Sequence, residues 1–330
     1  MAMRALWLLC VLGPASASCS ANPVPTGPAP LALERSIPLP EVGGRIDHLA
    51  YDPDGQRLFV AELGNGTVDA IHLGDGERLR LAGFHSPQGV AWLQRTHELA
   101  VASADGTVKF FGGDRLSPVA SLTLGEDADD LRVDPQSGDL IAGYGSGALA
   151  RIDPATHRVL RLLPLPAHPE GFQVDADAAF INVPDAGLVI AANRKSERIT
   201  ARWGTGLRRL NFPMAIDRTA KLLASGFRLP STLLLMDERS GAIRQALRTC
   251  GDADDIDFDD QRARLYVICG SGKIDVFRRS AEGYSHEATI ATRPGARTGL
   301  FDPQIDRLFV AAPARGQDSA AVLVYRPVAP

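Results

Sequence analysis

The sequence lacks the features of several protein classes. It has no run of 18 or more apolar residues, so no helix of the mature chain is predicted to span a membrane. It has no excess of basic residues, and its formal net charge of −4 argues against a nucleic-acid partner. Hydrophobic residues make up 45% of the 330 residues, so the composition is that of a globular chain with a large core.

Short motifs of catalytic and metal sites are missing as well. The sequence has no His-Glu-x-x-His, no pair of Cys-x-x-Cys motifs and no Gly-x-Ser-x-Gly elbow. The acidic run 255–259 lacks the glycine and the distant glutamate of an EF-hand loop. The glycines in 143–147 precede no predicted helix, so they do not form a phosphate-binding loop. Any metal or catalytic site would have to be assembled from distant parts of the chain.

The first residues have the pattern of an export signal. Arg4 supplies a positive charge, residues 5–12 form a short apolar segment, and Ala15-Ser16-Ala17 matches a cleavage signature. We therefore expect residues 1–18 to be a signal peptide and exclude them from the fold.

Cys19 leaves two kinds of export open. Residues 16–19 resemble a bacterial lipobox, in which Cys19 would carry a lipid, and the Pro-rich segment 19–30 suits a tether to a membrane. In the alternatives the protein is simply secreted and Cys19 has no role. The expected location is the periplasm or, for a lipoprotein, the outer membrane, and the membrane contact would be the lipid anchor alone. Each of these compartments is oxidising.

A short apolar strand pattern recurs seven times. Examples are Arg57-Leu-Phe-Val-Ala, Arg264-Leu-Tyr-Val-Ile and Arg307-Leu-Phe-Val-Ala. The copies begin at positions 57, 98, 139, 179, 221, 264 and 307. A period of roughly 40–45 residues with four short strands in each unit is typical of a β-propeller. The repeat predicts an all-β fold, a seven-bladed β-propeller of four-stranded blades, as a single domain over 31–330.

Turn residues and the chain ends refine this prediction. Acidic turns precede most copies, as at Asp52-Pro53 and Asp134-Pro135, and these carboxylates are expected to be structural. The last unit shows only three strands, whereas residues 31–39 form an unassigned strand before the first unit. We therefore expect this N-terminal strand to complete the last blade and close the ring.

The repeats resemble a known family. The segments that carry the likeness are 44–48, 87–91, 127–130, 168–170, 211–215, 251–255 and 295–298. With these segments the chain resembles YVTN-type propeller repeats and bacterial exported YncE-like propellers over nearly all of 31–330. The resemblance implies the seven-bladed fold. It implies no single function, because such propellers serve as binding proteins and scaffolds and, in related families, as lactonases or lyases.

The same segments contain the candidate binding residues. Each precedes the first, innermost strand of a blade, so all are expected at one end of the central channel. The loops after the second strands open there too and carry Glu62, Asn65, Tyr144, Asn182, Asp185, Arg228 and Arg315. The candidates on the inner segments are Arg45, Asp47, His48, Gln88, Asp129, Asp130, His168, Glu170, Asn211, Asp254, Asp255 and Arg297. Seven equivalent positions with seven different chemistries suit a ligand site. In the alternative they are only the solvated lining of a channel, with Arg45 and Arg297 neutralising the acids.

Two functions follow from this site. The first is an exported binding protein, expected to be a monomer, with a small molecule, a peptide or an envelope protein as its partner. The second is an enzyme of the lactonase or lyase type, with Glu170 or Asp254 as the base and His168 or His48 as the proton carrier. Arg45 and Arg297 would then hold an anionic substrate. No cofactor is assigned. A divalent cation remains open through Glu170, Asp129, Asp254, Asn211 and His168.

Cys250 and Cys269 are expected to form a disulfide. One lies just before the first strand of the sixth unit and the other ends its second strand, so both lie at the same edge of one blade. They are the only cysteines beyond Cys19. In an oxidising compartment two neighbouring thiols pair.

Overall fold

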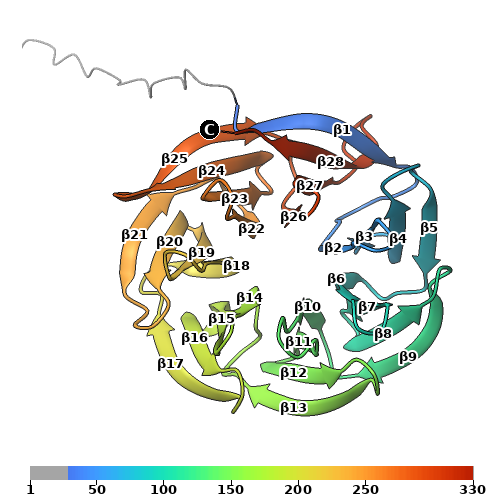
Figure 1. Ribbon diagram of the computed structural model, residues 1–330, viewed down its shortest axis with the longest axis horizontal. Helices are drawn as coiled ribbons and strands as arrows, with labels where there is room; N and C mark the ends of the chain where they lie inside the picture. Colours follow the sequence, from blue (N-terminus) through green and yellow to red (C-terminus); the bar gives the residue numbers. More distant parts are fainter. Residues whose placement is uncertain (1–28, 330) are drawn as a thin grey trace, which may run out of the picture.

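Seven four-stranded antiparallel sheets form a ring around a central channel (Figure 1). The computed structural model describes residues 29–329. The predicted signal peptide, Cys19 and the tether up to residue 28 lie outside the described residues. The prediction of a seven-bladed propeller with four-stranded blades is confirmed. We number the blades in chain order, and their first strands lie nearest the channel (Figure 1).

The first four blades follow one another along the chain. Blade 1 contains β2 (Leu49–Asp52), β3 (Arg57–Glu62), β4 (Thr67–His72) and β5 (Arg78–Ala82). Blade 2 contains β6 (Pro87–Leu93), β7 (Glu98–Ser103), β8 (Thr107–Gly112) and β9 (Ser117–Thr123). Blade 3 contains β10 (Ala128–Val133), β11 (Leu140–Tyr144), β12 (Ala148–Asp153) and β13 (Arg158–Pro164). Blade 4 contains β14 (Phe172–Val174), β15 (Ala178–Val183), β16 (Leu188–Asn193) and β17 (Arg198–Gly204).

The last three blades complete the ring. Blade 5 contains β18 (Arg209–Asp217), β19 (Leu222–Leu229), β20 (Ser231–Asp237) and β21 (Ile243–Arg248). Blade 6 contains β22 (Ala253–Asp259), β23 (Arg264–Cys269), β24 (Lys273–Ser280) and β25 (Gly283–Ala291). Blade 7 contains β26 (Thr298–Asp302), β27 (Arg307–Ala312), β28 (Ala320–Pro327) and β1 (Leu31–Leu39). In the described residues the one helical segment is a 3-10 turn, η1 (Pro184–Ala186), and no helix there could cross a membrane.

The apolar strand pattern reflects the position of each blade between two neighbours. Side chains of a strand point alternately to opposite faces, and here both faces are covered. On β3, Leu58 and Val60 pack in a cluster with residues of blade 7, whereas Phe59 and Ala61 pack in a cluster with residues of blade 2. Every one of the seven blade interfaces has such an apolar cluster, so the core consists of seven layers between blades.

The acidic turns between first and second strands are structural, as expected. Asp52 Oδ1 accepts the backbone N–H groups of Asp54 and Gly55 at 3.1 and 3.0 Å. Asp134 Oδ1 accepts those of Gln136 and Ser137 in the same way. These bonds satisfy turn donors that no strand pairs.

The prediction for the N-terminal strand is also confirmed. β1 pairs antiparallel with β28, from Leu31 opposite Pro327 to Leu39 opposite Ala320. Leu31 and Leu39 are 3% and 0% exposed, and they belong to the apolar layers on the two sides of blade 7. The outer strand of the last blade therefore comes from the other end of the chain (Figure 1).

Candidate functional site

A cavity of about 190 Å³ lies at the end of the channel where the chain enters each first strand. Six blades contribute to its lining. The lining residues are Arg45, His48, Gln88, Asp127, Asp129, Asp130, Arg132, His168, Glu170, Gly171, Phe212, Pro213, Met214, Arg228, Asp254 and Asp255. We call this set the channel cavity. Its walls are polar apart from Phe212, Pro213 and Met214.

β-bulges shape the channel cavity. In β6, β10, β18 and β22 the pairing with the second strand shifts by one residue near the same end of the strand. The residues at these shifts include Gln88, Asp129, Asp130 and Asp254. A bulge leaves its extra residue outside the ladder and redirects its side chain. Gly89 permits one of these shifts, since a Cβ atom there would lie 2.0 Å from the Asp129 carbonyl oxygen.

Glu170 is an unpaired carboxylate in this cavity. Its backbone N–H donates to the Asn182 carbonyl at 3.0 Å, which fixes the residue at the entrance to β14. Within residues 29–329, no hydrogen bond or ion pair engages its side chain. Burial raises the pKa of the Glu170 carboxyl to about 8, and the neighbouring Asp129 carboxylate adds to the increase.

His168 is held as a cation beside Glu170. Its Nδ1 lies 2.7 Å from the Gly145 carbonyl oxygen and therefore carries the proton, and its Nε2 lies 3.9 Å from Asp129 Oδ2. Burial lowers the pKa of the imidazole, but Asp129 and the Gly145 carbonyl outweigh it and raise the pKa to about 9. The same contact lowers the pKa of Asp129, where His168 outweighs the opposite effect of burial.

His48, Asp255 and Arg45 form the opposite wall. His48 Nδ1 lies 3.6 Å from Asp255 Oδ2, and Asp255 Oδ2 accepts the Gly299 N–H at 2.9 Å. Burial lowers the pKa of His48, but the Asp255 carboxylate outweighs it and the pKa is well above the usual range. Arg45 lies 3.1 Å from Asp47 Oδ2 and 3.6 Å from Asp254 Oδ2.

Arg228 connects the acids of blade 6 to an aromatic ring. Its guanidinium forms an ion pair with Asp254, and its Nε lies 3.2 Å from Asp252 Oδ1. It also covers the ring of Phe212, with 3.9 Å between the guanidinium carbon and the ring centroid. Burial raises the pKa of Asp254 to about 7, against the opposing effect of Arg228.

Two carboxylate oxygens of the cavity are buried without a hydrogen bond among the described residues, and one of them, Asp254 Oδ2, lies 3.6 Å from Arg45. Asp130 is 2% exposed; its Oδ1 accepts from Arg132, while its Oδ2 has no hydrogen-bond partner among the described residues. Asp254 is 9% exposed and its Oδ2 is also without a hydrogen bond there. A buried acceptor without a donor costs about 1–3 kcal/mol, so a ligand donor at these positions would be favourable.

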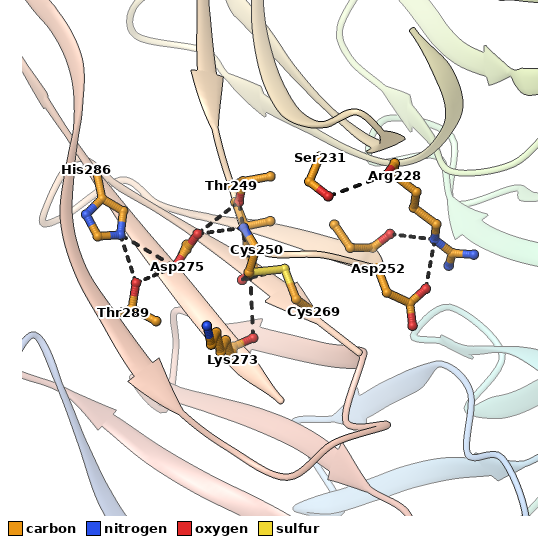
Figure 2. Close-up of a disulfide and its surroundings, with 12 residues drawn as sticks. Arg228, Ser231, Thr249, Cys250, Asp252, Cys269, Lys273, Asp275, His286 and Thr289 are labelled. Carbon is orange, nitrogen blue, oxygen red and sulfur yellow. Dashed lines mark hydrogen bonds and ion pairs between the residues drawn. A yellow bond between two sulfur atoms is a disulfide. The ribbon is translucent and has the colours of Figure 1, made fainter. Parts of the chain in front are cut away.

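The predicted disulfide supports this wall. Cys250 and Cys269 are bonded, with their Cα atoms 5.9 Å apart (Figure 2). The Cys250 N–H donates to Asp275 Oδ2 at 2.7 Å, which anchors the segment to β24. Two residues further on, Asp252 forms ion pairs with Arg228 and with Arg297, the latter at 3.0 Å. The disulfide thus fixes the start of β22, which carries Asp254 and Asp255 into the cavity.

The structure brings most of the predicted site residues together. Nine line the channel cavity: Arg45, His48, Gln88, Asp129, Asp130, His168, Glu170, Asp254 and Asp255. Asp47 is buried behind Arg45, at 1% exposure. Arg297 lies outside the lining, paired with Asp252.

Asn211 also lies outside the lining, in a buried amide network. Its Nδ2 donates to Asn182 Oδ1 and to the Leu188 carbonyl, both at 3.0 Å. Asn182 in turn donates to the Phe212 and Pro213 carbonyl oxygens at 3.1 and 3.0 Å. These two carbonyls belong to the β18 bulge. The network therefore fixes the wall that carries Phe212 and Met214.

Seven lining residues were not among the predicted site residues. They are Asp127, Arg132, Gly171, Phe212, Pro213, Met214 and Arg228. Asp127 and Phe212 lie within the segments 127–130 and 211–215 that the sequence singled out, so counting every residue of those segments would have included them. Arg228 lies in a loop that the sequence places at this end of the channel. Arg132 lies two residues after Asp130 on β10, on the same side of the strand, a signal that periodicity offers.

The cavity side chains do not form a metal site. Among residues 29–329, no group of three or more His, Cys, Asp or Glu side chains is arranged to hold a metal ion. The divalent cation that the sequence left open therefore finds no ligand cluster in this part of the chain.

The comparisons with known proteins define the fold class. The sequence matched no family model and no curated protein. Among solved structures, one chain of the mitotic checkpoint complex is 15% identical with a TM-score of 0.77, covering 98% of this chain and 100% of that one. A chain of Kuenenia stuttgartiensis hydrazine synthase is 14% identical with a TM-score of 0.73, covering 88% of this chain and 97% of that one. These likenesses show the β-propeller fold and assign no family.

Proposed function

We propose that this protein is an exported β-propeller that binds a ligand in the channel cavity, in the manner of the YVTN-type propellers that its repeats resemble. Seven-bladed propellers commonly act as binding scaffolds. Export is supported by the pattern of residues 1–18 and by the Cys250–Cys269 disulfide, a bond typical of oxidising compartments. The site proposed is the one that the first strands build at the channel end.

One observation carries the proposal. The channel cavity places buried carboxylate oxygens of Asp130 and Asp254, and the unpaired Glu170, around one hollow of about 190 Å³. A solvated lining is expected to keep its charges in contact with water or with each other. Buried acceptors without donors around a hollow are instead typical of a site that a ligand completes.

Capture of the ligand from a periplasmic extract tests the proposal. The purified mature protein is incubated with small-molecule extract, and the bound compounds are identified by mass spectrometry. We expect one compound to be enriched, and to be lost in Glu170→Ala, which should keep its fold because Glu170 is partly solvated. Glu282→Gln removes an exposed carboxylate from the hairpin between β24 and β25 and is the matched control.

A compound retained equally by Glu170→Ala and by the unmodified protein would contradict a site in this cavity. A compound whose enrichment is abolished by a substitution on the opposite face of the propeller would contradict a site in this cavity as well. Circular dichroism and thermal unfolding of both variants establish that any loss of binding does not come from loss of the fold.

An enzyme of the lactonase or lyase type is the second candidate. The observation that favours it is the pKa of Glu170, raised to about 8 by burial, beside a protonated His168. A base of that pKa and a protonated imidazole lining the same cavity suit proton transfer near neutrality. The captured compound distinguishes the two functions, since an enzyme converts it to product on incubation and a binding protein returns it unchanged.

A further inference from the structure

We infer that the channel cavity binds a protonated amine, held by the carboxylates of Asp130, Glu170 and Asp254. This inference rests on the proposed function, because it names the ligand class of that same site. It follows from which charges of the cavity already have partners and which do not.

Carboxylates outnumber cations in the lining. Six carboxyl side chains face three arginines and two histidines there, namely Asp127, Asp129, Asp130, Glu170, Asp254 and Asp255 against Arg45, Arg132, Arg228, His48 and His168. With every carboxyl ionised and both histidines protonated, the lining carries one more negative than positive charge. Because Glu170 and Asp254 hold their protons more strongly than usual, this surplus develops as the pH rises above neutrality. Asp47, buried behind Arg45, adds a further carboxylate.

The arginines are occupied by neighbouring carboxylates. Arg132 donates to Asp130, and Arg45 lies 3.1 Å from Asp47. Arg228 is paired with Asp254 and covers the face of Phe212. An anionic ligand would have to break these pairs. The anionic substrate that the sequence suggested for Arg45 and Arg297 is therefore not favoured by their contacts.

The polar groups of the cavity that lack a hydrogen bond are acceptors. Asp130 Oδ2 and Asp254 Oδ2 are buried without a hydrogen bond among the described residues, although Asp254 Oδ2 lies 3.6 Å from Arg45 and 3.9 Å from Arg297. The Glu170 carboxyl has no side-chain partner in the same part of the chain. Both aspartates are at least nine-tenths buried. An ammonium group offers two or three N–H donors and a positive charge, which match these acceptors in kind and in sign.

The cation is an organic one. Asp130, Glu170 and Asp254 belong to blades 3, 4 and 6, and no three acidic or histidine side chains of the described chain converge as metal ligands. The cavity volume of about 190 Å³ equals the space of roughly six waters, enough for a short amine or the end of a lysine side chain. A free amine and a lysine of a partner share this chemistry.

Calorimetric titration with 1,4-diaminobutane tests the inference. The mature protein is titrated at pH 8 and low salt with the diamine, with 1,4-butanediol, with succinate, with calcium chloride and with the peptide acetyl-Gly-Lys-Gly-amide. We expect the diamine or the lysine peptide to bind and the other three probes not to. Glu170→Gln should weaken that binding at least tenfold, while Glu282→Gln leaves it unchanged.

The pH profile supplies a second readout. The groups that face Glu170 are Asp129, His168, Asp254 and Arg228. A cation requires Glu170 and Asp254 as carboxylates, and both hold a proton more strongly than usual. Binding of the diamine should therefore release protons at pH 7 and tighten between pH 6.5 and 8.5. His168 becomes less repulsive towards the cation as the pH rises towards its pKa of about 9.

The failures of the two proposals are distinguishable. If succinate or calcium binds and Glu170→Gln alters that binding, the assignment of an amine ligand is wrong, but the cavity remains a binding site. The folded protein could bind neither amine probe and still capture a compound from the extract through the cavity. That result would overturn the assignment of an amine and leave the proposed binding function standing.

Discussion

At the scale of single residues, aspartates at the two ends of the propeller have pKa values shifted in opposite directions. Burial raises the pKa of Asp134, but hydrogen bonds from Arg194, Arg151 and two backbone N–H groups outweigh it and hold the pKa well below the usual range. Asp254 has fewer donors, so burial dominates and its pKa rises to about 7. Partners, and not burial alone, separate a turn aspartate from a cavity aspartate.

Glu62 gives a test of this principle away from the proposed ligand. It is 0% exposed, accepts a hydrogen bond from Thr67, and has no partner for Oε1 among the described residues. Burial raises its pKa to about 7, and Asp69 adds to the increase against Thr67 and Arg80. The folded protein then binds this proton more tightly than the unfolded chain. The contribution of the protonated Glu62 to stability is present at low pH and falls as the pH rises from about 4.5 to 7.

We predict that Glu62→Gln removes this decline. Relative to the unmodified protein, the variant should gain about 2 kcal/mol of unfolding free energy between pH 5 and pH 8. Urea unfolding at pH 5, 6.5 and 8 measures it. Glu77→Gln, an exposed carboxyl in the same blade, is the control and should run parallel to the unmodified protein. Parallel curves for Glu62→Gln as well would show that Glu62 titrates normally.

The sequence predicted which residues meet at the channel end but not what each one does. Asp129 and Asn211 occupy equivalent places in the repeat, yet Asp129 lines the cavity and Asn211 binds Asn182. The difference depends on where the bulge falls in each first strand, at 129–130 in β10 and at 212–213 in β18. Bulges follow from contacts between blades, which a repeat pattern does not encode.

At the scale of elements, strand positions were predictable because burial on both faces imposes a nearly continuous apolar run. β23 is buried along its whole length, and β27 nearly so. The outer strands follow a weaker pattern, since β13 is exposed at all but one of its positions. The disulfide was predictable for a related reason: the four-strand repeat fixes which strand ends share an edge.

We predict that removing the disulfide destabilises the protein by about 3 kcal/mol, the loop-closure value for residues this far apart in the chain. The variant Cys250→Ser/Cys269→Ser should show a lower urea midpoint with an unchanged slope. Adding a reductant should lower the midpoint of the unmodified protein and leave that of the double variant where it is. Equal midpoints for the two oxidised proteins would mean that the bond adds nothing to stability.

At the scale of the whole molecule, the two ends of the described chain, residues 29–329, meet on the face opposite the channel cavity. First strands begin at the cavity and successive strands alternate in direction, so β28 ends on the far face. Leu31 pairs with Pro327 there, and the Val328 N–H donates to the Pro30 carbonyl at 2.9 Å.

Closure of the ring by β1 is the last feature that can be tested. Without β1, blade 7 would expose the edge of β28, and the layers on both its sides would lose Leu31 and Leu39. Removing a buried leucine side chain costs about 2–5 kcal/mol, and an open edge of apolar strand invites pairing with a second chain. The ion pair of Arg307 with Glu34 would be lost as well.

A protein that begins at residue 40 should therefore unfold roughly 10 °C or more below one that begins at residue 29, and it should form soluble aggregates. Differential scanning calorimetry and light scattering compare the two. The protein that begins at residue 29 is the matched control because it keeps β1 intact. Adding a synthetic peptide of residues 29–40 should restore part of the lost stability, since the strand is held by pairing and packing and not by its connection to blade 1. Equal melting temperatures for the two proteins, with no aggregation, would show that three strands suffice for blade 7.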